Sequence, residues 1–233
     1  MKSFLYSFCK VFICTTLWFN ASLFAQKVHP KRNLPVKESI SNGKCDFYVI
    51  FLTGDFGFLN FDKEIVHYLN VKNASVVVLN SKSYFGSAKS PVQMGHDLGS
   101  IINQYNKKWN KHKVVIMGYS MGAEVIPFGV NRMDEKSRLK IMDVILIAPG
   151  QKAIFRLKPT DYLFEDKKGT DIYTELLKMR GQRSYIICDD SQISICRKNL
   201  EGVTDHDFLG GGHHFGRDFN HLSKLIGRRL NLE

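Results

Sequence analysis

KVVIMGYSMGAEVIPF, residues 113–128, is the stretch that decides the fold. Its first five residues are mostly apolar, which predicts a buried strand. The strand runs into GYSMG, residues 118–122, and then into residues compatible with a helix. A strand, a G-x-S-x-G turn and a helix in this order form a nucleophile elbow, whose tight turn leaves no room for a side chain on either flank of the serine. The pattern predicts that Ser120 is lifted clear of the sheet and that the first amides of the helix face negative charge formed there.

A G-x-S-x-G sequence alone is weak evidence, because a glycine-rich turn between a strand and a helix has the same letters. The rest of the chain adds context, since apolar segments alternate with amphipathic ones. The predicted strands span 46–53, 75–80, 113–117, 140–147, 184–188 and 202–209. The predicted helices span 61–72, 90–110, the segment after the elbow to about residue 132, and 218–230. This alternation predicts an α/β fold with a mostly parallel sheet of about six strands and helices on both faces.

Ligands of such sheets bind at the carboxyl ends of the strands, so the loops there are where chemistry is expected. GGGHHF follows the last strand, and His213 is the expected general base, because hydrolases of this type often carry G-x-G-H-x-F. A surface loop with two solvated histidines is the alternative. Asp189 and Asp190 follow the strand that ends at residue 188, and we favour Asp190 as the orienting acid because it lies later in the turn, with Asp189 as the alternative. The order Ser120, Asp, His213 is that of the α/β-hydrolase fold.

An oxyanion hole needs two backbone N–H groups. One is expected from Met121, the residue after the serine. The other is expected from the loop TGDFG after the first core strand, with Asp55 the favoured donor and Phe56 the alternative. The same loop is also compatible with an ordinary strand-to-helix turn.

Two further side chains, Tyr119 and His214, are candidates for lining the substrate pocket, because they flank Ser120 and His213 in the sequence. The sequence predicts no metal site, since the adjacent histidines would splay apart and no third ligand is near them. It predicts no nucleotide cofactor either, because no phosphate-binding glycine motif occurs.

The N-terminal 25 residues have the form of a secretory signal peptide, with a basic start, an apolar run over residues 11–24 and a plausible cleavage point at Ala25-Gln26. The run is short and interrupted by polar residues, which favours cleavage over an uncleaved anchor. Gln26 stands where a lipoprotein needs a cysteine. We therefore expect an exported, periplasmic protein that is not a lipoprotein. Residues 26–45 are polar and proline-punctuated and predict a linker or an edge element before a domain over 46–233.

The length and net charge of the chain limit the classes of binding partner to expect. The chain of 233 residues is long enough for one domain with a sizeable core. Its net charge is +11, and without the two lysines of the signal peptide 31 basic and 22 acidic residues leave +9. This charge suits an anionic phospholipid or membrane surface, with a simply soluble basic protein as the alternative. No helix carries a basic and aromatic stripe, so no nucleic-acid partner is expected, and the oligomeric state stays open.

Exported proteins meet oxidising conditions, so a disulfide is expected. Cys188 and Cys196 are the predicted pair because they flank a short loop, which leaves Cys45 as a lone thiol.

Several segments together resemble the bacterial virulence proteins of the VirJ/AcvB family, which are exported α/β-hydrolase-like proteins. They are TGDFGF (53–58), SYFGSAKSP (83–91), GYSMGAEVIPF (118–128), NRM (131–133) and GGHHF (211–215). The resemblance runs from about residue 46 to 230 and matches the short, single-domain form. It implies hydrolysis of aminoacylated phosphatidylglycerol, notably its lysyl ester, at the periplasmic face of the inner membrane. The family usually has glycine where Asp189 stands here, which keeps both aspartates open as the acid.

The leading interpretation is therefore an exported serine hydrolase that cleaves a small carboxylic ester, the aminoacyl ester of a phospholipid. An esterase for a soluble acylated substrate is the second interpretation. A non-catalytic envelope or secretion-associated binding protein on a hydrolase scaffold is the third.

Overall fold

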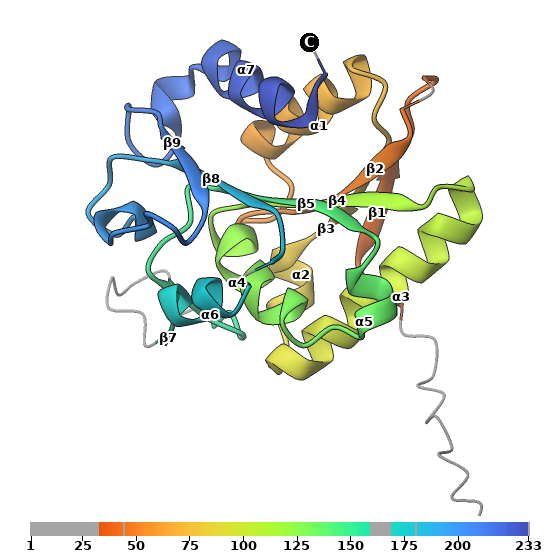
Figure 1. The fold of residues 1–233 in the computed structure, drawn as a ribbon, viewed down its shortest axis with the longest axis horizontal. Helices are drawn as coiled ribbons and strands as arrows, with labels where there is room; N and C mark the ends of the chain where they lie inside the picture. Colours follow the sequence, from red (N-terminus) through yellow and green to blue (C-terminus); the bar gives the residue numbers. More distant parts are fainter. Residues whose placement is uncertain (1–32, 44, 159–168, 180, 233) are drawn as a thin grey trace, which may run out of the picture. The chain divides into compact units, whose positions relative to one another are not determined.

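The computed structural model describes residues 33–43, 45–158, 169–179 and 181–232. In this part of the chain seven strands form one sheet, in the order β1-β3-β2-β4-β5-β8-β9 (Figure 1). The strands are β1 (Val36–Ser39), β2 (Phe47–Leu52), β3 (Val76–Leu79), β4 (Lys113–Tyr119), β5 (Ile141–Ile147), β8 (Ser184–Cys188) and β9 (Asp205–Phe208). All neighbouring strands are parallel except β1, which pairs antiparallel with β3 at the edge. The predicted α/β-hydrolase fold with its mostly parallel sheet is confirmed.

Helices cover both faces of the sheet. On one face lie α1 (Asn60–Val71) and α7 (Phe219–Leu230), and on the other lie α2 (Ser81–Phe85), α3 (Pro91–Trp109), α4 (Met121–Val130) and α6 (Ile172–Lys178) (Figure 1). The short helix α5 (Glu135–Arg138) precedes β5 and contacts α3. A two-stranded ribbon of β6 (Lys152–Ala153) and β7 (Thr170–Asp171) leads into α6. Within the described residues no helix is long and apolar enough to cross a membrane.

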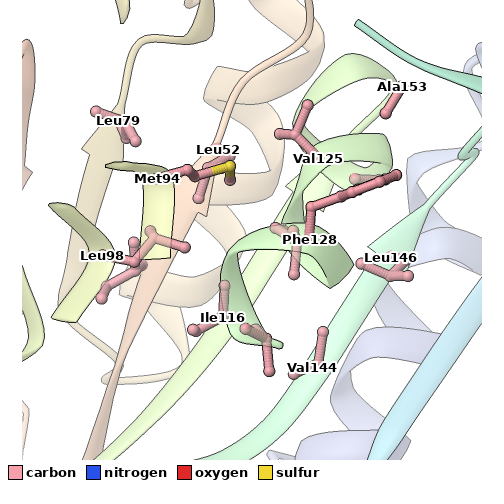
Figure 2. Packing of buried hydrophobic residues seen from close by; sticks show 14 of the residues in the cluster. Leu52, Leu79, Met94, Leu98, Ile116, Val125, Phe128, Val144, Leu146 and Ala153 are labelled. Carbon is pink, nitrogen blue, oxygen red and sulfur yellow. The ribbon is translucent and has the colours of Figure 1, made fainter. Parts of the chain in front are cut away.

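Alternation along each strand divides its side chains between two cores. In β2, Tyr48, Ile50 and Leu52 pack on the side of α3 and α4, and the residues between them pack on the side of α1 and α7. Every residue of β2 is buried, because both faces are covered by helices. This is why the central strands are continuous apolar runs. Figure 2 shows the first core, where Leu52, Ile116 and Val144 of the strands meet helix side chains that include Met94 and Phe128.

The sequence predicts a linker or an edge element before the domain, and the structure describes part of this region. Residues 36–39 form the edge strand β1, so this part of the expected linker is an edge element of the sheet, and it accounts for the strand beyond the six expected. The expected signal peptide over residues 1–25 lies outside the described residues.

Candidate active site

Ser120 occupies the turn between β4 and α4 with φ 52° and ψ −122°, a left-handed backbone that residues other than glycine rarely adopt. Both flanking glycines are required by space. A methyl group on Gly118 would lie 2.6 Å from the backbone of Gly122, and one on Gly122 would lie 2.3 Å from the carbonyl oxygen of Leu52. The turn therefore has the geometry that the G-x-S-x-G pattern predicts.

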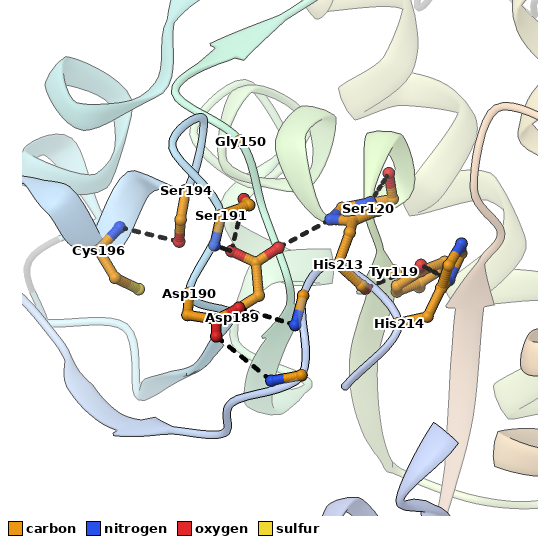
Figure 3. Close-up of polar contacts among 12 residues, drawn as sticks. Tyr119, Ser120, Gly150, Asp189, Asp190, Ser191, Ser194, Cys196, His213 and His214 are labelled. Carbon is orange, nitrogen blue, oxygen red and sulfur yellow. Dashed lines mark hydrogen bonds and ion pairs between the residues drawn. The ribbon is translucent and has the colours of Figure 1, made fainter. Parts of the chain in front are cut away.

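A chain of hydrogen bonds links this serine to a histidine and a carboxylate (Figure 3). Nε2 of His213 lies 2.8 Å from Oγ of Ser120, and Nδ1 of His213 lies 2.8 Å from Oδ2 of Asp189. An ionised carboxylate only accepts hydrogen bonds, so Nδ1 carries the proton and the Nε2 lone pair faces the serine hydroxyl. The three groups come from the loops after β4, β8 and β9, which meet at the carboxyl ends of the strands. This arrangement can accept the serine proton when the hydroxyl attacks an electrophile.

The preference for Asp190 as the orienting acid is wrong in this geometry, and the alternative, Asp189, makes the contact. The side chains of the two neighbouring residues point to different partners. Asp190 is exposed and accepts hydrogen bonds from the backbone N–H groups of Gly212, at 2.7 Å, and Gly211, at 3.3 Å. It therefore shapes the backbone of the loop that carries His213 without touching the imidazole.

The carboxyl of Asp189 is 2% exposed and sits in a loop closed by a disulfide. Its Oδ1 accepts hydrogen bonds from the hydroxyl of Ser191, at 2.9 Å, and from the backbone N–H of Ser191, at 3.3 Å. The disulfide joins Cys188 and Cys196 with a Cα–Cα distance of 5.8 Å, which confirms the predicted pair. It ties the end of β8 to the short helix after the acid loop, so it limits how far Asp189 can move away from the histidine.

Electrostatics keeps Asp189 charged. Burial of the carboxyl opposes ionisation, but hydrogen bonds from His213, Ser191 and Ser194 outweigh that effect and hold the pKa of Asp189 below its usual value. A carboxylate that stays ionised can hold the imidazole in the required tautomer and can stabilise an imidazolium formed during reaction.

The predicted oxyanion donors lie beside the serine. Met121 is the first residue of α4, and the first N–H groups of a helix have no intrahelical acceptor. The loop after β2 passes close to the elbow, because a methyl group on Gly54 would lie 3.8 Å from Cβ of Ser120. Both predicted loop donors, Asp55 and Phe56, line the same cavity as Ser120. The assignment of either backbone amide to the oxyanion hole stays a prediction.

The cavity at the serine measures about 580 Å³ and is largely apolar. Its apolar wall comprises Phe56, Leu59, Phe61 and Phe219. A cavity of this size accommodates a small-molecule substrate. Ser120 and His213 line it together with these apolar side chains.

The two predicted pocket residues, Tyr119 and His214, line this cavity and also hold the histidine loop. The hydroxyl of Tyr119 donates to the carbonyl oxygen of His213 at 3.1 Å and lies 2.6 Å from Nδ1 of His214. A hydroxyl has one proton, so Nδ1 of His214 is the donor in the second contact. Burial and the neighbouring His213 and Arg217 lower the pKa of His214, which favours its neutral form.

Sequence reasoning missed Asp62, which is 2% exposed in the first turn of α1 and lines the cavity. Its carboxyl accepts hydrogen bonds from the backbone N–H of Leu59 at 2.9 Å and of Gly54 at 3.4 Å, so it holds both ends of the 54–59 loop. Burial raises the pKa of Asp62 to about 6, although these hydrogen bonds oppose the rise. An acidic residue in the first turn of a predicted helix is the signal that could have pointed to it.

Within the described residues no group of three or more histidine, cysteine, aspartate or glutamate side chains is placed to hold a metal ion.

A mostly parallel sheet, a strained serine at a strand-to-helix turn and the chain order Ser, Asp, His define the α/β-hydrolase fold class. The chain is similar to the structure of MenH from S. aureus, with 12% identity, a TM-score of 0.59, and coverage of 86% of this chain and 100% of that one. It is also similar to the structure of ferulic acid bound to Est1E from Butyrivibrio proteoclasticus, with 10% identity, a TM-score of 0.59, and coverage of 84% of this chain and 94% of that one. A lipase-esterase related protein from Clostridium acetobutylicum shows 13% identity, a TM-score of 0.59, and coverage of 83% and 99%.

Within this class, the sequence model of the bacterial virulence protein VirJ matches residues 46–232. The chain belongs to the VirJ family. No curated protein sequence matches it significantly.

Proposed function

We propose that this protein is a serine hydrolase that cleaves a carboxylic ester. The observation that carries the proposal is the pair of 2.8 Å contacts that link Ser120 to His213 and His213 to Asp189. Ser120 attacks the ester carbonyl while Nε2 of His213 takes the hydroxyl proton, and Asp189 stabilises the resulting imidazolium. The proton then passes to the leaving alcohol, and a water activated by the same imidazole hydrolyses the acyl-enzyme.

The negative charge that develops on the carbonyl oxygen needs hydrogen-bond donors that face this oxygen. The amide of Met121 and one amide of the 54–56 loop are proposed for this role. The loss of one such donor typically raises the barrier by about 2.7–4 kcal/mol.

The proposed substrate is the aminoacyl ester, in particular the lysyl ester, of phosphatidylglycerol. The family match over residues 46–232 supports this choice through the resemblance described above. The side chains of the cavity agree with it, because aromatic walls suit the lipid part and the carboxylates of Asp55 and Glu64 line the same cavity. A carboxylate is the group that an aminoacyl ammonium pairs with.

The proposed site of action is outside the cytoplasm, at the periplasmic side of the inner membrane. The signal-peptide form of the N-terminus supports this location, and the Cys188–Cys196 disulfide agrees with it, since disulfides persist in oxidising compartments. Fractionation of cells that express the full chain tests the location, and recovery in the cytoplasm would contradict it.

A fluorophosphonate probe tests the nucleophile. We expect labelling of the protein, loss of labelling in Ser120→Ala, and full labelling in the control Ser100→Ala, a change at an exposed serine of α3. Labelling that persists in Ser120→Ala, or that never occurs, would favour a non-catalytic binding protein on this scaffold.

A substrate comparison tests the ester. The purified protein is incubated with lysyl-phosphatidylglycerol in vesicles and with short-chain soluble esters, and the released lysine or alcohol is measured. Turnover of soluble esters alone would replace the lipid proposal with the soluble-esterase alternative.

A further inference from the structure

Large apolar side chains are exposed at the mouth of the cavity. Phe56 is 57% exposed and Leu59 is 53% exposed, and both belong to the loop between β2 and α1. Both residues also line the cavity together with Phe61 and Phe219, so the exposed surface continues into the site. Exposed apolar residues that continue into a binding cleft indicate an interaction surface more often than scattered single residues do.

The loop that presents these side chains is held by its own hydrogen bonds. The N–H of Gly57 donates to the carbonyl of Gly54 at 3.1 Å, and the N–H of Leu59 donates to the buried Asp62 at 2.9 Å. Gly57 has φ 87°, a conformation that side-chain-bearing residues adopt at a cost. The backbone is therefore fixed in a turn that directs Phe56 and Leu59 outward without help from a partner.

Basic side chains surround this loop. Lys37 lies with its Nζ 5.8 Å from the ring centre of Phe58, and a methyl group on Gly57 would lie 3.5 Å from Cβ of Lys82. Arg217 is exposed and also lines the cavity. Lys63 is exposed in the first turn of α1, next to the loop.

The acidic side chains near the loop are fewer. They are Asp55 and Glu64, which line the cavity, and the buried Asp62. Of these named groups the four basic side chains and Glu64 are exposed, Asp55 is half-buried and Asp62 is buried. The exposed charge around the loop is therefore more basic than acidic, in keeping with the net charge of +9 that remains without the two lysines of the signal peptide.

We propose that Phe56 and Leu59, with Lys37, Lys63, Lys82 and Arg217 around them, form a mouth surface that docks on an anionic lipid bilayer. The two apolar side chains enter the boundary between headgroups and acyl chains, and the basic side chains pair with lipid phosphates. Docking in this orientation brings the cavity mouth to the headgroups, so an ester there reaches Ser120 without leaving the membrane. The choice of a lipid surface as the occupant rests on this charge complementarity, and its use in catalysis rests on the proposed function.

The test measures binding apart from catalysis. The Ser120→Ala protein, which is expected to leave lipids intact, is sedimented with vesicles of phosphatidylglycerol and phosphatidylethanolamine, and with vesicles of phosphatidylcholine alone. We expect binding to the anionic vesicles that weakens as salt is raised, because exposed charges are screened. Weak binding is expected to the neutral vesicles.

A matched pair of variants locates the contact. Phe56→Ser with Leu59→Ser, in the Ser120→Ala background, is expected to lower the partition onto anionic vesicles by at least about tenfold, since each side chain buries apolar area. The control combines Val71→Ser and Leu139→Ser, which remove residues that are 62% and 78% exposed at the opposite end of the strands. The control is expected to bind like the parent, and thermal unfolding verifies that both proteins are folded.

Equal binding of the mouth variant and its parent, or an equal loss in the control, would overturn the proposal. Absence of vesicle binding would also overturn it and would favour a protein partner at this surface. The vesicle-binding test and the fluorophosphonate-labelling test can fail independently of each other. A protein that is labelled at Ser120 but does not bind vesicles refutes only the docking, and one that binds vesicles but is never labelled refutes only the hydrolase.

Discussion

Replacement of Asp189 by asparagine tests the assignment of the orienting acid. The Oδ1 side of this carboxyl accepts two hydrogen bonds from Ser191, so the carboxamide oxygen of the variant is expected to take that side. The amide NH₂ then faces Nδ1 of His213, which at present lies 2.8 Å from Oδ2. Two donors cannot pair, so the imidazole must move its proton to Nε2, and that proton points at the hydroxyl of Ser120. The histidine can then no longer accept the serine proton.

The size of the loss follows from this change of tautomer. The same substitution in a Ser-His-Asp protease lowers kcat by about 10⁴, which corresponds to roughly 5.5 kcal/mol in the barrier. The matched control is Asp190→Asn. The oxygen of that carboxamide can still accept from Gly212, and only the longer contact with Gly211 is lost, at the surface. A lost hydrogen bond of this kind costs about 1 kcal/mol, so we expect less than about a tenfold effect.

The assay is the second-order rate constant for fluorophosphonate labelling of Ser120 at neutral pH, which needs no knowledge of the natural substrate. Circular dichroism verifies that both variants are folded. Asp189 is not the orienting acid if Asp189→Asn is labelled as fast as the unchanged protein, or if Asp190→Asn loses more of the rate than Asp189→Asn does.

Three further predictions concern stability. Burial raises the pKa of Asp62 from 3.8 to about 6, so the folded state opposes ionisation of this carboxyl and the unchanged protein loses stability as pH rises from 3.8 to 6. Asp62→Asn avoids this loss, so its free energy of unfolding in urea is expected to rise by about 3 kcal/mol relative to the unchanged protein over the same pH range. Burial opposes ionisation of Glu175 as well, but hydrogen bonds from Arg132 and Lys178 lower its pKa from 4.5 to about 2. Glu175→Gln is therefore expected to lower the free energy of unfolding by about 2–3 kcal/mol above pH 4.5, and this loss should disappear as pH falls to about 2. A loss that is unchanged near pH 2 would contradict this prediction. Cys188→Ser opens the disulfide loop and is expected to lower stability by roughly 2–3 kcal/mol and to slow labelling, whereas a normal labelling rate would show that the disulfide does not position the acid.

Local sequence patterns predicted the elements that local physics controls. The elbow could be inferred because its turn is local: a side chain at Gly118 would meet the backbone of Gly122 and Ala123 within the same segment. The helix from Pro91 could be inferred because Ser90 caps it, with its hydroxyl accepting the backbone N–H of Gln93 at 3.1 Å. The Cys188–Cys196 pair could be inferred because the two residues flank one short loop.

Contacts between distant segments could not be inferred in the same way. The strand β1 pairs with β3, about forty residues further along the chain, and nothing in its four residues specifies that partner. Asp62 is an intermediate case. Its contact with the N–H of Leu59 is local and typical of an acidic residue in a first helical turn, whereas its contact with the N–H of Gly54 depends on how the loop folds back onto α1.

The choice between Asp189 and Asp190 shows most clearly what cannot be predicted from the sequence alone. The sequence by itself determined that a serine, an acidic pair and a histidine each follow a strand, in the chain order of a hydrolase, because strand periodicity and turn chemistry are local properties. Only the tertiary structure decided which carboxyl meets His213. Neighbouring side chains at the end of a strand point in different directions, and the loop after β9 reaches one of them with its imidazole and the other with its backbone amides.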